Sequence, residues 1–463
     1  MSEPDNIRSI NKMPLVTVLL IGTIIAILNQ TLLTTAIPHI MSELNIDEST
    51  AQWLSSVFML VNGIMIPITA FLIGTFTTRN LFLSAMGLFL LGTIIAIVSP
   101  NFFVLLIGRI VQASGAGILM PLMQTILLII YPVEKRGQIM GTVGLVIAFA
   151  PAIGPTLSGY IVDHYQWKTV FHILLYVGMA DILAAWFILK NVTQQTFPKV
   201  DILSIILSTL GFGGILYGFS IAGSSGWISL QVLITIPLGI LALIWFILRQ
   251  LKLESPILEL RVFKYPIFSL SVIISTIAFS TMIASEMLLP IYMQNMLGFK
   301  AMKSGLVLLP GAIIMGLLSP ITGRVFDKIG ARWLTICGMS IIIITTFFFT
   351  QMSIDTTFTY LTVVYGIRMV GMAMVLMPIT TAGLNRLSLK LIPHGTALVN
   401  TIRQVGASIG TAVFVTIMVT TASIDESPNA ISNGIHGVNT AFWAATGLCI
   451  LALVLSLFVK DTK

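Results

Sequence analysis

Apolar runs long enough to cross a membrane recur along this chain and are separated by short polar connectors. A membrane helix needs about 20 consecutive apolar residues, and the runs lack the short alternating segments of a membrane β-barrel. The pattern predicts an all-α polytopic membrane protein with fourteen transmembrane helices, at about 14–36, 51–75, 81–99, 102–130, 138–160, 169–189, 202–221, 230–250, 267–291, 304–322, 333–351, 358–380, 395–420 and 438–459. An even number of spans places both termini on one side.

Composition supports this interpretation and changes how the positive net charge is interpreted. Hydrophobic residues make up 56% of the chain, charged residues only 9%, and the mean hydropathy is +1.01. The net charge of +7 is therefore no sign of a nucleic-acid partner. Of the 24 lysines and arginines, 18 fall in the tails and connectors on the N-terminal side, three in the opposite connectors and three within spans. This bias predicts that both termini are cytoplasmic.

An internal repeat divides the chain. The sequence Leu-Met-Pro ends at Pro121 and again at Pro378, and Gly137 and Gly395 open later spans at nearly the same offset. We interpret residues 1–190 and 266–463 as two six-helix bundles, with two inserted helices in residues 191–265. Parallel repeats of this kind are a known plan for transporters.

Two carboxylates lie well within spans, Asp181 in the inner half of the membrane and Glu286 in the outer half. A charge there costs about 2.5–3.5 kcal/mol on insertion scales, so each calls for a reason. A carboxyl group shielded from water can exchange protons near neutral pH. Both are candidate proton carriers. The alternatives are an interfacial carboxylate for Glu286 and a structural hydrogen-bond partner for Asp181.

Arginines within the spans are the expected counter-charges. Arg109 lies at about the depth of Glu286, and Arg403 at about the depth of Asp181. An arginine keeps its charge when buried, so it can influence a neighbouring carboxylate without titrating. A fixed structural ion pair is the alternative for each.

The remaining polar and aromatic positions suggest a pocket rather than a catalytic centre. A substrate pocket is expected to include Asn29, Gln30, Phe149 and Arg403, although such residues also pack helices or face lipid. The histidines show no metal-ligand spacing, and no glycine-rich ATP loop is present. We therefore expect no metal and no cofactor, with the proton gradient as the energy source.

The stretch from Ala148 to Gly159 combines Pro151 and Pro155 with a row of small residues that includes Gly154. Proline removes a backbone donor, which a membrane tolerates where neighbours satisfy the freed carbonyl. Small residues allow close helix approach. This predicts a kinked helix at a moving interface, although glycine and proline are common in membrane helices generally.

The inner connector from Gly323 to Arg332 is expected to turn at its glycines. Asp327 is placed there to cap a neighbouring helix or to form a salt bridge at its end, and such a contact would latch one state of a moving pair of bundles. The alternative is a solvated turn.

Three stretches together resemble the major facilitator superfamily. Gly323–Arg332 is similar to its cytoplasmic loop signature, Gly108–Gly117 to its fourth-helix signature, and Ala148–Gly159 to the fifth-helix signature of its drug:proton antiporters. Fourteen spans resemble the fourteen-helix branch, which includes bacterial lincomycin and multidrug exporters. The resemblance implies alternating access, a role for Arg109 in proton coupling, and a seal at the fifth helix. That branch usually has an aspartate where Asn29 stands here, which shifts the expected proton site to Glu286 and Asp181.

These observations predict a proton-coupled antiporter that exports amphipathic drugs, and not an enzyme. We expect a monomer in the bacterial cytoplasmic membrane, with drug-like molecules, protons and the lipid bilayer as its partners. The alternative is a proton-coupled transporter of one specific metabolite, lipid or peptide. A receptor or scaffold is disfavoured because the short connectors leave little surface for a partner.

Overall fold

A computed structural model of the protein describes residues 12–193, 195–196, 200–424 and 430–460. These residues form helices joined by short connectors and contain no strand. Fourteen of the helices are long and apolar enough to cross a membrane. The predicted fold class is therefore confirmed.

The first half contains six long helices and one short turn. Their bounds are α2 Lys12–Leu44, α3 Glu48–Thr75, α4 Thr78–Val98, α5 Phe102–Ile130, η1 Val133–Lys135, α6 Arg136–His164 and α7 Thr169–Ile188. Polar caps set several of the starts. The side chain of Asp47 accepts a hydrogen bond from the backbone N–H of Thr50, and that of Asn101 from Val104, each at 3.1 Å. Such caps satisfy donors that the first helical turn leaves free.

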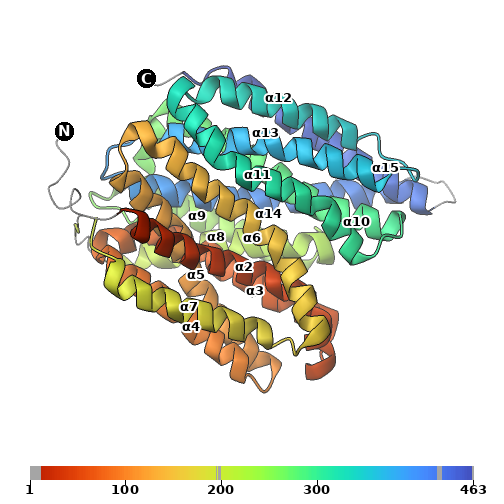
Figure 1. The fold of residues 1–463 in the computed structure, drawn as a ribbon, viewed down its shortest axis with the longest axis horizontal. Helices are drawn as coiled ribbons and strands as arrows, with labels where there is room; N and C mark the ends of the chain where they lie inside the picture. Colours follow the sequence, from red (N-terminus) through yellow and green to blue (C-terminus); the bar gives the residue numbers. More distant parts are fainter. Residues whose placement is uncertain (1–11, 194, 197–199, 425–429, 461–463) are drawn as a thin grey trace.

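The second half follows the same plan. Its bounds are η2 Leu260–Lys264, α10 Pro266–Ile291, the π-helical turn η3 Tyr292–Met296, α11 Ala301–Ile329, α12 Ala331–Phe349, α13 Phe358–Leu384, α14 Ile392–Ile424 and α15 Ala430–Ser456. Helix α2 begins and α15 ends at the same end of the molecule, on the left in Figure 1. Helix α6 packs against α11 and α3 packs against α14, so these two pairs join the halves.

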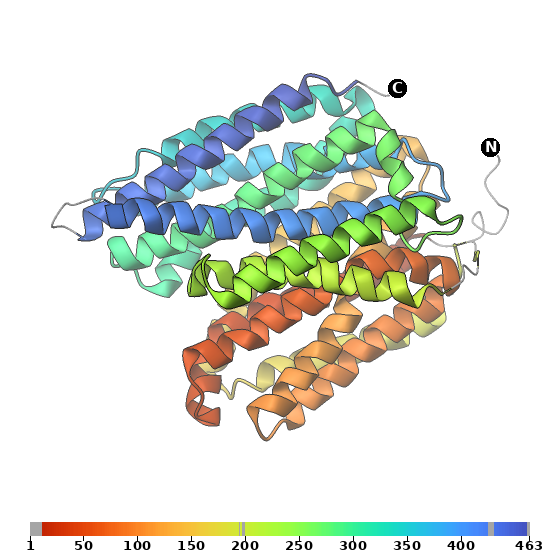
Figure 2. The same cartoon turned by 180° about the vertical axis from the view of Figure 1, so that it is seen from behind.

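The two inserted helices, α8 Ile202–Ser225 and α9 Leu230–Lys252, form a hairpin against α3 and α14. In Figure 2 this green pair lies beside the red α3 and the blue α14, so it covers one seam between the halves. Asp201 caps α8 and forms an ion pair with Arg249 at 2.8 Å. The hydrogen bond from Arg249 holds the pKa of the Asp201 carboxyl at about 2, well below its usual value. At the other end of the hairpin, the indole N–H of Trp227 donates to Thr416 of α14 at 2.7 Å.

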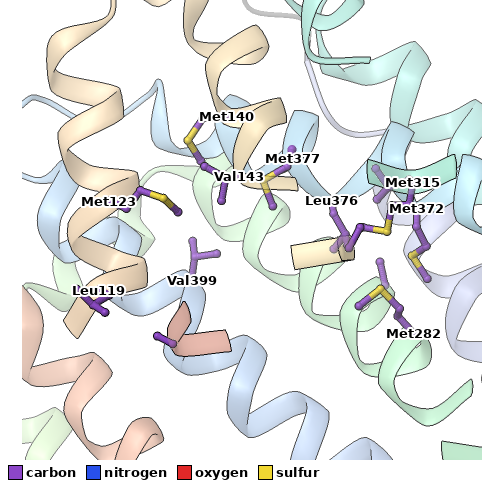
Figure 3. Close-up of a cluster of buried hydrophobic side chains, with 14 of the residues drawn as sticks. Leu119, Met123, Met140, Val143, Met282, Met315, Met372, Leu376, Met377 and Val399 are labelled. Carbon is purple, nitrogen blue, oxygen red and sulfur yellow. The ribbon is translucent and has the colours of Figure 1, made fainter. Parts of the chain in front are cut away.

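Methionines are prominent in the core between and within the halves. Met140 of α6 and Met377 of α13 come from opposite halves and lie near each other, whereas Met282, Met315 and Met372 gather inside the second half (Figure 3). All five are at most 3% exposed. Unbranched methionine side chains adapt to irregular surfaces, which suits helices that must change partners.

Candidate functional site

Arg109 is fully buried within the first half. Its Nη1 donates to Oε1 of Gln112 at 3.0 Å, and its Nε donates to the carbonyl oxygen of Leu54 on α3 at 3.2 Å. Its guanidinium carbon lies 4.2 Å from the ring centre of Phe58. A cation over an aromatic face is stabilised when it is desolvated. Arg109 is therefore held by dipoles and an aromatic ring rather than by a carboxylate.

Gln112 connects Arg109 to two further helices. Its Nε2 donates to the hydroxyl of Thr93 on α4 at 2.9 Å, and its Oε1 accepts from Nδ2 of Asn29 on α2 at 3.3 Å. We call Asn29, Thr93, Arg109 and Gln112 the first cluster. Asn29 is 1% exposed and lies against Gln112. The neighbouring Gln30 is partly buried.

Glu286 lies on α10 in the second half. Helix α10 packs against α13, which carries Tyr365 and the buried Arg368. Arg368 is fully buried and donates from Nη2 to the carbonyl oxygen of Thr281 at 3.0 Å and from Nη1 to the hydroxyl of Thr346. We call Thr281, Thr346 and Arg368 the second cluster. Sequence reasoning placed three arginines within spans but missed Thr346 as a partner of Arg368.

The structure does not bring together the charge pairs suggested by depth alone. Glu286 and Arg109 do not meet, because they lie in different halves and Arg109 turns towards α3. Asp181 is 3% exposed, lies against the backbone of Gly22, and has no hydrogen-bond partner for either carboxylate oxygen among the residues described. Arg403 instead donates to the carbonyl oxygen of Leu376 at 3.2 Å and to the Thr380 hydroxyl.

Asp327 joins the halves at the end where α6 begins. Its two carboxylate oxygens accept the backbone N–H groups of Gly137 at 2.7 Å and Gln138 at 2.8 Å. The preceding residue, Lys135, provides no side-chain cap to α6. A carboxylate from α11 therefore caps the first turn of α6, where the helix dipole favours negative charge. We call this contact the latch.

Of the two glycines expected to turn near the latch, Gly330 does so and Gly323 does not. Gly323 lies inside α11 rather than at a turn, and a Cβ atom there would strike the carbonyl group of Gly137. Gly330 makes the turn, with φ of +86°, which glycine adopts readily. Arg332 follows in the exposed first turn of α12.

Gly154 and Ser158 in the proline-containing stretch of α6 face a helix of their own half. A Cβ atom on Gly154 would strike the hydroxyl of Thr31 on α2, and the Ser158 hydroxyl donates to the carbonyl oxygen of Leu32 at 2.5 Å. Helix α6 continues through both Pro151 and Pro155. The close approach predicted here thus exists, but it joins α6 to α2 and not to the other bundle. No atom approaches the Cβ position of Gly159 within 4 Å.

Uncharged side chains supply further contacts between the halves, and sequence reasoning overlooked them. Asn400 of α14 donates to Gln124 of α5 at 2.7 Å, and the hydroxyl groups of Thr125 and Thr396 lie 2.7 Å apart. These residues carried no signal in the sequence beyond being polar within a span.

Comparison with known proteins identifies the family. Residues 19–411 match the profile described as Major Facilitator Superfamily. The chain belongs to the Major Facilitator Superfamily. It is therefore a membrane transporter and not an enzyme. It is 51% identical to the uncharacterized MFS-type transporter YcnB of Bacillus subtilis, over 98% of this chain and 97% of the relative. It is 42% identical to the lincomycin resistance protein LmrB of Listeria monocytogenes, over 98% of both chains. The human organic anion transporter MFSD10 (TETRAN) has the same fold, with a TM-score of 0.68 at 13% identity, over 96% of this chain and 99% of that one.

In this major facilitator transporter the contacts between α6 and α11 run from the latch towards the middle of both helices. A Cβ atom on Gly144 would come within 2.8 Å of Ser319, and one on Gly316 would strike the ring of Phe149. Phe149 thus packs over α11 at the interface between the halves. The latch, the Ser319 contact and the Phe149 contact close this end of the interface.

Proposed function

We propose that this transporter is a proton-coupled antiporter that exports amphipathic drugs from the cytoplasm by alternating access. The observation that carries the proposal is Glu286, a carboxyl group inside the membrane helix α10, in the half that also holds the fully buried Arg368. Ionisable residues within a membrane mark ion pathways and proton relays. A relative named a lincomycin resistance protein, 42% identical over 98% of the chain, supports drug-like substrates.

The exchange uses the two orientations of the transporter. Protons that enter from outside neutralise Glu286, with Asp181 as a second candidate carrier, and loss of negative charge weakens the binding of a cationic or zwitterionic drug. The drug leaves to the outside, the transporter resets inward, and the proton is released to the cytoplasm when the next drug binds. Inward movement of protons thus opposes outward movement of drug, and the proton gradient supplies the energy without a cofactor.

The location of the basic residues supports an orientation for this cycle. The 18 basic residues in connectors and tails on one side support a cytoplasmic location for both termini and for the latch. Bacterial relatives support the cytoplasmic membrane as the location. In the orientation proposed, this structure is closed towards the cytoplasm. We also propose that the transporter acts as a monomer.

Everted membrane vesicles test the coupling. Respiration acidifies their interior, which a pH-sensitive dye reports, and lincomycin is then added. We expect lincomycin to release protons from vesicles that contain the transporter and not from vesicles that lack it. If neither lincomycin nor a panel of amphipathic cations moves protons, the antiport proposal is wrong. A growth-inhibition panel that shows protection against a single compound would favour the transporter of one specific substrate.

A further inference from the structure

A groove lies on the flank of the second half, between α11 and α12 and over α13. Both helices pack on α13, which lies between them in Figure 1. The groove has a volume of about 340 Å³. Its walls include Leu318, Val325 and Ile329 of α11, Trp333 and Cys337 of α12, and Met374 of α13. We call the space between these residues the lateral groove.

The lateral groove is long and apolar. Its wall on α11 runs from Leu318 to Ile329, which is about 16 Å at about 1.5 Å per helical residue. That length is close to the depth of one leaflet, half of a hydrocarbon core about 30 Å thick. Thr322 also lines the groove, but its hydroxyl already donates to the carbonyl oxygen of Ala373 on α13 at 2.7 Å. The groove therefore suits one extended hydrocarbon chain.

The lateral groove faces the membrane rather than the interface between the halves. Val325 and Ile329 each follow a residue of the α6 contact, Gly323 and Asp327, by two positions. Two positions correspond to about 200° around a helix, at about 100° per residue. The groove and the contact with α6 thus occupy opposite faces of α11. The groove is therefore separate from any path for a drug between the halves.

Basic residues adjoin the lateral groove at its latched end. Lys328 precedes Ile329 and Arg332 precedes Trp333, and all four residues are exposed. The acidic residue of this connector, Asp327, instead turns its carboxylate to the backbone of α6. Tryptophan is enriched where a membrane helix meets water, and basic pockets between membrane helices bind anionic headgroups. The apolar groove thus ends beside positive charge at the level expected for headgroups.

We propose that the lateral groove binds an anionic phospholipid from the leaflet on the latched side of the membrane. One acyl chain lies between α11 and α12, and the phosphate-containing headgroup lies at Lys328 and Arg332. This site is independent of the proton coupling and of the exported molecule proposed above.

Photoactivatable lipids test this site on the full chain in nanodiscs. A phosphatidylglycerol and a phosphatidylcholine carry the same diazirine in the same acyl chain, and mass spectrometry locates the cross-linked peptides. A basic residue near a membrane surface contributes roughly fivefold to the binding of anionic lipid. With two such residues, we expect phosphatidylglycerol to label the lateral groove at least about tenfold more than phosphatidylcholine. Unlabelled phosphatidylglycerol should compete, and lincomycin should not.

Matched variants separate the headgroup contact from the acyl-chain contact. Lys328→Gln and Arg332→Gln should each lower the preference for phosphatidylglycerol roughly fivefold. Lys300→Gln is the control for charge, because Lys300 is exposed at the opposite end of α11, and it should keep the preference. Cys337→Phe should fill the groove and remove its cross-links, whereas Ile344→Phe, at an exposed position further along α12, should not. Thermal unfolding would show that each variant is folded.

The possible outcomes either support or overturn the proposal. Equal labelling of the groove by the two lipids would mean ordinary boundary lipid, and it would overturn the proposal. An undiminished preference in a folded variant that lacks both Lys328 and Arg332 would do the same. Competition by lincomycin would make the groove a drug site instead. Absence of cross-links from the groove in wild type would mean that a second copy of the chain or another partner covers it, which also overturns the proposal.

Discussion

Replacement of Asp327 by asparagine tests whether the latch sets the balance between the two orientations of the transporter. The native carboxylate accepts two backbone N–H groups at 2.7 and 2.8 Å from the first turn of α6. Asparagine has the same shape but can accept only one of them and carries no charge. A hydrogen bond to a charged group contributes about 1.5–3 kcal/mol, so Asp327→Asn should weaken the latched state by about 2 kcal/mol.

That energy predicts a large change in population. About 1.4 kcal/mol corresponds to tenfold in an equilibrium constant, so the ratio of unlatched to latched molecules should rise roughly 30-fold. Spin labels at Lys135 of the first half and Lys390 of the second, both exposed at the latched end, would report it as a new long-distance population. Cys337 is exposed and must be replaced before labelling, whereas Cys449 is buried.

A matched substitution separates the latch from a general effect of lost charge. Asp355→Asn removes the same charge from an exposed connector at the opposite end and should leave the distance distribution unchanged. If the ratio of unlatched to latched molecules in Asp327→Asn also stays within twofold of wild type, then the bonds of Asp327 to α6 do not decide the orientation, and the reasoning fails. A thermal unfolding measurement on each variant would show whether the labelled protein is still folded.

Two further predictions concern stability. Gly154→Val should destabilise the transporter by about 1–3 kcal/mol because the valine side chain would strike Thr31. Gly159→Ala should not, because the space around Gly159 is open. Thermal unfolding would distinguish the two variants, and equal unfolding midpoints would contradict the packing described. Asp201→Asn should lower the unfolding temperature by roughly 1–2 °C through the lost pair with Arg249. The folded pKa of Asp201, about 2, lies below its unfolded value. The difference from wild type should therefore be constant above about pH 5 and shrink below about pH 4; a difference that instead grows on acidification would contradict this sign.

The fold could be predicted from the sequence because membrane helices satisfy their own backbone hydrogen bonds. Each span therefore depends on local hydrophobicity, and fourteen runs gave fourteen helices. The contact of Asp327 joins residues that lie far apart in the sequence. Its sequence context suggested a cap on a neighbouring helix, but the backbone groups of Gly137 and Gln138 carry no recognisable signal in the sequence. The role of Gly323 was mistaken for a turn because α11 extends as a helix to Ile329.

Pairs of polar residues were harder to predict because depth in the membrane leaves the direction of a side chain open. Asp181 and Arg403 share a depth but lie on α7 and α14, in different halves, and Arg403 turns towards α13. Glu286 and Arg109 fail to meet for the same reason. Only the packing of whole helices determines which charges face each other.

The buried arginines show the same limit. Arg109 donates to Gln112 and to the carbonyl oxygen of Leu54, whereas Arg368 donates to Thr346 and to the carbonyl oxygen of Thr281. These uncharged partners carried no signal in the sequence beyond being polar.

The helix of Arg368 also contacts the helix that carries the latch. Helix α13, which carries Arg368, accepts a hydrogen bond at the carbonyl oxygen of Ala373 from Thr322 of α11 at 2.7 Å. Helix α11 also carries Asp327, so contacts link α13 through α11 to the bonds that join the halves. A movement of α13 must therefore strain or move α11 and the latch.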